Sequence, residues 1–97
     1  MDRVKIGPTV FEIELVERLV GPNNEKLDGI IKYGDSKILI EDSFSNQHTR
    51  QVLWHEILHG ILTQAGISLD NEEVVCDALS YGILNVLQDN SWLGHNV

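Results

Sequence analysis

The hydrophobic pattern changes character near residue 43, and this change limits the possible folds more than any other feature. Before it, hydrophobic and polar residues alternate, as from Phe11 to Leu15, or form short runs such as Ile38-Leu39-Ile40. Gly34-Asp35 separates two such runs and suits a two-residue hairpin turn that begins with glycine. After residue 43, hydrophobic residues recur every three or four positions, the period of an α-helix. The pattern predicts strands over residues 3–41, helices over residues 45–66 and 70–89, and a tail over residues 90–97.

These elements predict a single domain of the α+β class, in which a small antiparallel sheet is followed by two helices. Ser43 or Ser45 can cap the first helix, and Gly66 can end it. Asp70 and Glu73 have the spacing of a capping box at the start of the second helix. The residues predicted to form the buried stripes are Trp54, Ile57, Leu58, Ile61, Leu62 and Ala65 on the first helix, and Val75, Ala78, Leu79, Gly82, Ile83 and Val86 on the second.

Charge narrows the classes of function. The chain has 7 Lys and Arg residues against 15 Asp and Glu residues, a formal net charge of −8, and no cation after Arg50. Such an acidic chain is poorly suited to nucleic acid or to anionic membranes, and no hydrophobic run is long enough to span a bilayer. The single cysteine, Cys76, cannot form an internal disulfide, which is typical of a reducing compartment. We expect a cytoplasmic protein without nucleic-acid or membrane partners.

The segment His55-Glu56-Ile57-Leu58-His59 lies within the first predicted helix. Histidines four residues apart on a helix share one face, so both imidazoles can reach the same ion. Glu56 lies beside them, where it can take a proton from a metal-activated water. The segment therefore predicts one bound Zn²⁺ with His55 and His59 as ligands and Glu56 as the general base.

A catalytic zinc normally takes a third protein ligand. Leu62 and Ala65 occupy the positions where metzincins have a glycine and a third histidine, which excludes that class. The candidates are the carboxylates that begin the second helix, Glu73 first and Glu72 as its nearest competitor. Asp77 shares a helix face with Glu73, so it can accept an imidazole N–H while Glu73 reaches the metal.

The same residues carry a resemblance to gluzincin metallopeptidases. Glu72-Glu73-Val74-Val75-Cys76-Asp77 resembles their thermolysin-type Asn-Glu-x-x-Ser-Asp run at its Glu and Asp, but has Glu for Asn and Cys for Ser. Glu73-x-x-Cys76-Asp77-x-Leu79-Ser80 is similar to the Glu-x-x-Ala-Asn-x-Phe-Ala signature of ImmA/IrrE-like metallopeptidases, often phage-borne. Chain length and the order of elements resemble the minigluzincins. The resemblance implies that Glu73 is the third ligand and that Asp77 orients His55.

We therefore expect a zinc metallopeptidase that hydrolyses peptide bonds. Because no cation follows Arg50, the donor that stabilises the oxyanion is expected among a few side chains, with His95 and Tyr81 named first and His48 and Tyr33 as further candidates. The resemblance to zincins also implies that the edge of the strand containing Ile38, Leu39 and Ile40 binds an extended peptide.

Other expectations concern packing and partners. Gly60 is expected to let the second helix approach the first closely. The partner is a peptide or protein substrate, and the chain can also self-associate through the sheet edge or the C-terminal tail. The alternative function is a non-catalytic module, in which zinc ties the two helices together and an exposed surface binds another protein.

Overall fold

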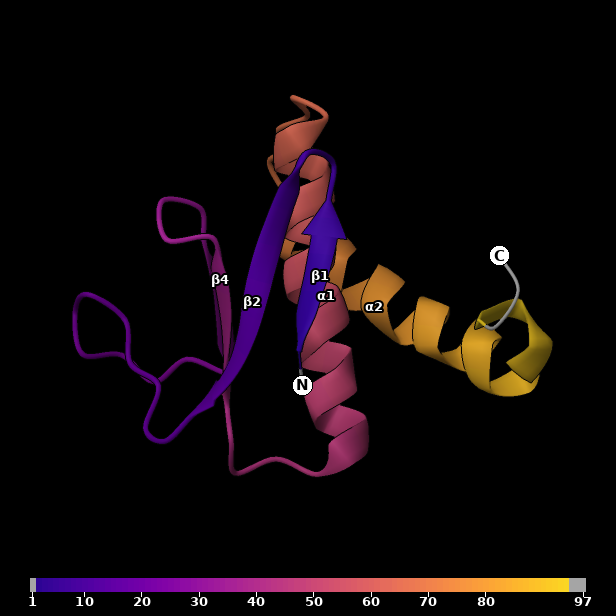
Figure 1. Ribbon diagram of the computed structural model, residues 1–97, viewed down its shortest axis with the longest axis horizontal. Coiled ribbons are helices and arrows are strands. Elements are labelled where there is room, and N and C mark those ends of the chain that lie inside the picture. The colour runs from indigo at the N-terminus through magenta and orange to yellow at the C-terminus, as the bar shows by residue number, and fades with distance from the viewer. Residues whose placement is uncertain (1, 95–97) are drawn as a thin grey trace.

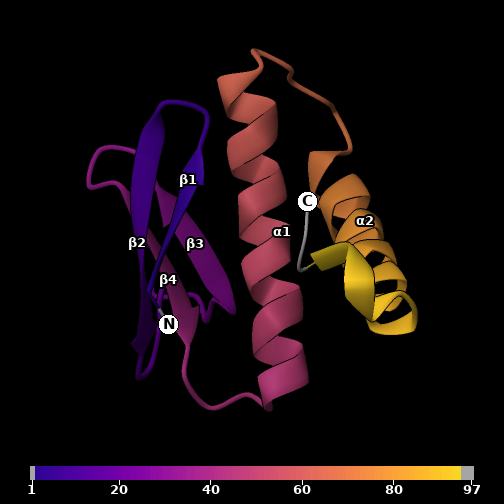
Figure 2. The ribbon, with the colours of Figure 1, turned by 45° about the vertical axis from the view of Figure 1, so that its right-hand side comes forward.

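Four strands precede two helices in the chain, and the first helix lies between the sheet and the second helix (Figures 1 and 2). The computed structural model describes residues 2–94. The elements are β1 (Arg3–Ile6), β2 (Thr9–Val16), β3 (Gly29–Lys32), β4 (Lys37–Glu41), α1 (Asn46–Gln64), α2 (Glu72–Asp89) and the short 3₁₀ helix η1 (Ser91–Gly94). The predicted α+β order of strands followed by helices is confirmed.

The sheet is mixed, so the prediction of a wholly antiparallel sheet is wrong. Its order is β1-β2-β4-β3, and the central pair, β2 and β4, runs parallel, whereas β1–β2 and β3–β4 are antiparallel. Residues 17–28 connect β2 to β3 and cross the place in the sheet that β4 fills. β4 therefore lies between β2 and β3, and β3 is an edge strand. Ile38 and Ile40 are fully buried because β4 has a neighbouring strand on each side and packs against α1.

The turn between β3 and β4 is longer than the predicted two-residue turn. Lys32 pairs with Lys37, and the Ser36 N–H donates to the Tyr33 carbonyl at 3.3 Å. The positive φ of 52° falls on Ser36 rather than on Gly34. The Tyr33 hydroxyl lies 2.9 Å from the Thr63 hydroxyl, and this contact joins the β3–β4 turn to α1.

The core lies between the sheet and one face of α1. Its buried residues are Ile6, Phe11, Ile38, Ile40, Val52 and Ile57. A Cβ atom at Gly60 would lie 2.9 Å from Cδ1 of Ile6 and 3.1 Å from Cδ1 of Ile31. Gly60 therefore lets α1 approach the sheet, and the expectation that it makes room for the second helix is wrong.

The two ends of α1 follow their predicted cap residues. The Ser45 hydroxyl accepts a hydrogen bond from the His48 N–H at 3.2 Å and caps α1. Gly66, with φ of 72°, ends it, and the Ile67 N–H donates to the Leu62 carbonyl at 2.9 Å, as in a Schellman motif. The predicted capping box of α2 does not form.

At the start of α2 the N-cap is Asn71, whose side chain makes no capping hydrogen bond to the described residues. The carboxylate of Glu73 instead faces the histidines of α1. The acidic residues of this first turn are therefore available for the site between the helices.

The predicted stripe of α2 is largely exposed. The buried residues of this helix are Cys76, Ser80 and Leu84, whereas Leu79 and Val86 are about half exposed. Within residues 2–94, α2 packs on α1 and η1 and contacts no strand. On α1, Ile57 is buried as predicted, but Ile61 and Ala65 are exposed. A hydrophobic surface of the helical layer is thus left uncovered by residues 2–94.

Candidate metal centre

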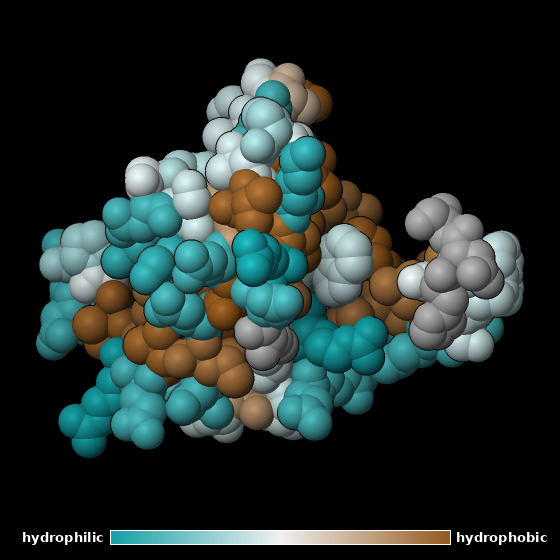
Figure 3. Space-filling view, in the orientation of Figure 1, coloured by the Kyte–Doolittle hydropathy of each residue, from teal (hydrophilic) through white to brown (hydrophobic). Residues whose placement is uncertain are grey.

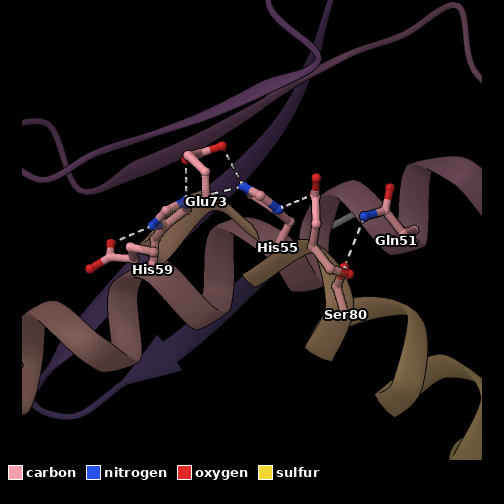
Figure 4. A network of polar contacts seen from close by, with 7 residues as sticks. Gln51, His55, His59, Glu73 and Ser80 are labelled. Carbon is pink, nitrogen blue, oxygen red and sulfur yellow. Dashed lines mark hydrogen bonds and ion pairs between the residues drawn. The ribbon is translucent and has the colours of Figure 1, made fainter. Parts of the chain in front are cut away.

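α1 presents the two motif histidines side by side on the face that packs against α2. The His55 and His59 side chains are only 10% and 13% exposed, and their Nε2 atoms lie 3.0 Å apart. Figure 4 shows both rings directed toward Glu73. The spacing of four residues thus produces the shared face that the sequence predicts.

α2 completes the group with Glu73. One carboxylate oxygen lies 2.6 Å from Nε2 of His59, and the other lies 3.3 Å from Nε2 of His55. The three ligand atoms lie within 4.8 Å of one another, and this is the group suited to a metal ion in the part of the chain that the structure describes. The predicted set of His55, His59 and Glu73 is therefore brought together as a possible metal site.

The outer nitrogen of each histidine faces a second carboxylate. Nδ1 of His55 lies 2.7 Å from Oδ1 of Asp77, and Nδ1 of His59 lies 2.6 Å from Oε2 of Glu72. The His55 contact is short but not aligned as a hydrogen bond, and this buried nitrogen has no other partner among the described residues. Carboxylates at Nδ1 leave Nε2 free to bind a metal and raise the basicity of the ring.

The structure separates the positions of Glu72 and Glu73, which the sequence could not do. It lies beside Glu73 in the chain, but it contacts the outer nitrogen of His59, whereas Glu73 contacts the inner one. A rotation of about 100° per residue separates neighbouring side chains on a helix. The spacing of the acids alone therefore could not decide which of them reaches the metal.

A buried polar contact fixes α2 on α1 beside the site. The Gln51 side chain donates to the Ser80 hydroxyl at 2.8 Å (Figure 4). That hydroxyl donates to the Asp77 carbonyl at 2.8 Å. Gln51 lies one helical turn before His55. No sequence motif marks this contact, so it was not predicted.

Glu56 lies on the sheet side of α1, in the same cleft as the metal group. Its residue is 7% exposed, and burial raises the pKa of its carboxyl above the ordinary value. Burial lowers the pKa of His59, but the Glu72 hydrogen bond and the charges of Glu73 and Glu56 outweigh that effect and raise the pKa. A buried carboxyl of raised pKa is suited to accepting and returning a proton near neutral pH.

Cys76 is not part of the metal group, although it lies on the same helix as Glu73. Its side chain is fully buried. Burial, followed by the nearby acidic charges, raises the pKa of its thiol to about 11.

The cleft has a volume of about 300 Å³ and is bordered by β3 and both helices. Its lining residues are Lys26, Leu27, Asp28, Gly29, Gln51, Val52, His55, Glu56, Glu73 and Asp77. Among the described residues, Lys26 is the one cation in this lining. Lys26 lies in a loop far from the motif in the chain, so no sequence pattern connects it with the site.

The donor set and its spacing fit a zinc ion. Zinc bonds of 2.0–2.1 Å in a tetrahedron separate the ligand atoms by about 3.3 Å. Here the two Nε2 atoms lie 3.0 Å apart, and Nε2 of His59 lies 2.6 Å from the nearer Glu73 oxygen, so these atoms must move apart by several tenths of an ångström. Two imidazoles and one carboxylate are a ligand set that zinc takes in catalytic sites.

Other predicted site residues lie elsewhere. Tyr81 and His48 line a separate hollow between the start of α1 and the second half of α2, and Tyr33 lies in the β3–β4 turn. His95 lies outside the described residues. The prediction that the strand Ile38–Ile40 binds peptide through its edge is wrong, because β4 is paired on both sides.

No helix among residues 2–94 has the length and hydrophobicity needed to cross a membrane. Comparison of the chain with protein-family models, with curated proteins and with solved structures gave no match. The resemblance to gluzincins therefore depends on the residues of this site and on the order of the elements that carry them.

Proposed function

We propose that this chain is a zinc-dependent metallopeptidase of the gluzincin type. The observation that supports the proposal is the convergence of His55, His59 and Glu73 at one edge of a cleft that also contains Glu56. Glu73 is 77% exposed, so the metal group is open to solvent and to a substrate on its cleft side. A purely structural zinc site is normally closed by four protein ligands, whereas three ligands leave a position open.

Each residue has a role in this proposal. When bound, a zinc ion lowers the pKa of water toward 7 and polarises a carbonyl oxygen. The Glu56 carboxylate accepts the proton of the attacking water and returns it to the leaving amine. Asp77 and Glu72 hold the histidine rings through Nδ1, which directs both Nε2 atoms toward the metal position.

The free edge of β3 takes the substrate role that the sequence assigned to β4. Among the strands of the described chain, β3 pairs with β4 only, and Asp28 and Gly29 line the cleft. The Glu41 N–H donates to the Asp28 carbonyl, and antiparallel pairing alternates, so the backbone amides of Gly29 and Ile31 point to the unpaired side. An extended peptide can add to the sheet along these groups and pass beside Glu56.

The proposal is tested by zinc content and peptide cleavage together. The wild type is expected to bind one zinc ion per chain and to cleave members of a peptide library. Glu56→Gln should retain zinc and lose at least about 100-fold in kcat/KM, because the carboxylate is replaced by a group that cannot accept a proton. Glu73→Ala should lose zinc. Glu12→Gln, on the exposed side of β2, is the matched control and should retain both properties.

The opposite result has a defined meaning. A wild type that holds one zinc ion, resists unfolding only when zinc is bound and cleaves no peptide would support the alternative, a non-catalytic module in which zinc ties α1 to α2. Equal cleavage by the wild type and Glu56→Gln would reject the assigned base.

A further inference from the structure

We propose that Lys26 makes the metal cleft selective for a peptide that carries a carboxylate on the C-terminal side of the bond to be cleaved. The carboxylate is either an acidic side chain or the free C-terminus, and the two sources have the same chemistry. The inference rests on the proposed function, because it takes a peptide as the occupant of the cleft, and it adds the charge class of that peptide.

β3 runs in the same direction as α1. At the beginning of β3, a Cβ atom at Gly29 would lie 2.6 Å from Cγ1 of Val52. Just after its end, the Tyr33 hydroxyl lies 2.9 Å from the Thr63 hydroxyl, which is eleven residues further along α1. The residues that precede Gly29 therefore lie toward the beginning of α1.

The cleft extends from the metal group in that same direction. In the described part of the chain, its lining residues on α1 lie between Gln51 and Glu56, and its other wall is the segment 26–29. The Asp28 carbonyl accepts a hydrogen bond of 2.9 Å from the backbone N–H of the last residue of β4, so this wall continues the extended backbone of β3. Lys26 is the first residue of the wall and lies at its end away from β3.

This direction decides which side of a bound peptide meets Lys26. A peptide that adds antiparallel to the free edge of β3 places its C-terminal side along residues 26–28, and antiparallel pairing is slightly more stable than parallel pairing. Parallel addition would place the N-terminal side there, and a free amino group would then meet a lysine of like charge. Both effects favour a carboxylate at Lys26.

The charge of Lys26 is open to a ligand. Lys26 is exposed, and the ion pairs that Lys and Arg form within residues 2–94 do not include it. Figure 3 shows hydrophilic side chains exposed at the end of the molecule where the loop of residues 17–28 lies. The loop backbone is fixed, because Lys26 forms a β-bridge with Val20 and the Leu27 N–H donates to the Leu19 carbonyl at 3.0 Å. A fixed backbone reduces the entropy lost on binding.

The acidic residues of the cleft do not reverse this preference. Glu73 and Asp77 contact the histidines of the metal group, and Glu56 is the proposed base. A zinc ion would add two positive charges beside these three acids. Asp28 is the remaining acid of the lining, and a substrate cation beside it would be repelled by Lys26 and by the zinc ion.

The test is peptide binding to the zinc-loaded Glu56→Gln variant by isothermal titration calorimetry, because the proposed base is then absent and the peptides stay intact. The probes are N-acetylated tetra-alanine extended by one residue, which is Gln amide, Glu amide, Lys amide or Gln with a free carboxylate. At least one carboxylate peptide should bind about fivefold more tightly than the Gln amide peptide, as expected for a favourable exposed ion pair. The peptide that does so identifies the source of the carboxylate.

Charge variants at position 26 assign the preference to this lysine. Lys26→Gln should abolish it, and Lys26→Glu should reverse it in favour of the Lys amide peptide. Lys32→Gln removes the same charge from an exposed position of β3 outside the cleft lining, so it is the matched control and should keep the preference. Added salt should weaken the preference, because exposed charges are screened.

Several results would overturn the proposal: equal or absent binding of the four peptides, tighter binding of the Lys amide peptide, or a carboxylate preference that persists in Lys26→Gln. The last result would mean that the zinc ion binds the carboxylate. Cleavage assays keep this inference separate from the proposed function. If carboxylate peptides bind through Lys26 and the wild type cleaves no peptide, the peptidase proposal fails alone. If the wild type cleaves peptides and Lys26 has no effect on their binding, this inference fails alone.

Discussion

Each histidine of the metal centre makes contacts of two kinds, one through each ring nitrogen. Both Nε2 atoms face Glu73, and the Nδ1 atoms face Asp77 and Glu72. Four carboxylates, counting Glu56, thus surround two imidazoles. This concentration of negative charge favours a divalent cation between the helices.

At the residue scale, we predict that Glu72 holds a ligand and is not a ligand itself. Glu72→Ala should weaken zinc binding by about 10–100-fold, as expected for the loss of a group that orients a coordinating histidine. Asp77→Ala should have a similar effect through His55. Titration against a competing chelator measures both, with Asp70→Ala as an exposed control. Complete loss of zinc with Glu72→Ala, together with full binding by Glu73→Ala, would reverse the assignment of the two acids.

The motif residues could be predicted from the sequence because their geometry is local. Residues 55 and 59 share a helix face wherever that helix lies, so His55 and His59 needed no knowledge of the fold. The choice between Glu72 and Glu73 depends on how α2 is rotated against α1. The buried Gln51–Ser80 contact helps to set that rotation, and such a contact leaves no periodic signal in the sequence.

The strands also show that a sequence pattern predicts local structure but not how the elements pack together. Hydrophobic patterning placed the strands within residues 3–41, because it reports burial and backbone period. It does not report which strands are neighbours. The run Ile38-Leu39-Ile40 lacks alternation, which is consistent with the interior position of β4, and the free edge beside the cleft belongs to β3.

For β3, we predict an alternating response to substrate N-methylation. Blocking a substrate amide that pairs with Gly29 or Ile31 should lower kcat/KM roughly tenfold, since one hydrogen bond is lost and the methyl group obstructs pairing. Methylation of the neighbouring amides, which point away from the sheet, should have little effect. The comparison uses one peptide sequence methylated at successive positions. A uniform loss at all positions would argue against binding by strand addition.

In the whole molecule, α2 is attached to the rest of the described chain through α1 alone, with η1 at its end. The core lies on the other side of α1, between that helix and the sheet. A metal held by His55, His59 and Glu73 would therefore join α2, the helix with the fewest packing partners, to α1, which packs on the core. The helical periodicity of α2 did not predict this arrangement, because its hydrophobic residues do not face the chain's own core.

We predict that zinc raises the thermal stability of the chain. Zinc at about 100 times its Kd should stabilise the folded state by about 2.7 kcal/mol. For a domain of this size that corresponds to a rise in Tm of roughly 10–20 °C, and calorimetry with and without a chelator measures it. Glu73→Ala should show almost none of this shift. A wild type whose Tm does not respond to zinc would mean that the site binds no zinc in the folded state.

The parallel pairing of β2 with β4 has a consequence for the order in which the molecule is assembled. Every strand lies before residue 42, and every proposed metal ligand lies after residue 54. The two hairpins, β1–β2 and β3–β4, join neighbours in the chain, so the parallel pair between them is the step within the sheet that requires the longer loop to close. During synthesis from the N-terminus, all residues of both hairpins, including those of the β2–β4 pair, therefore leave the ribosome first. The helices that carry the ligands leave it afterwards, when every residue of the sheet is already available to pack against them.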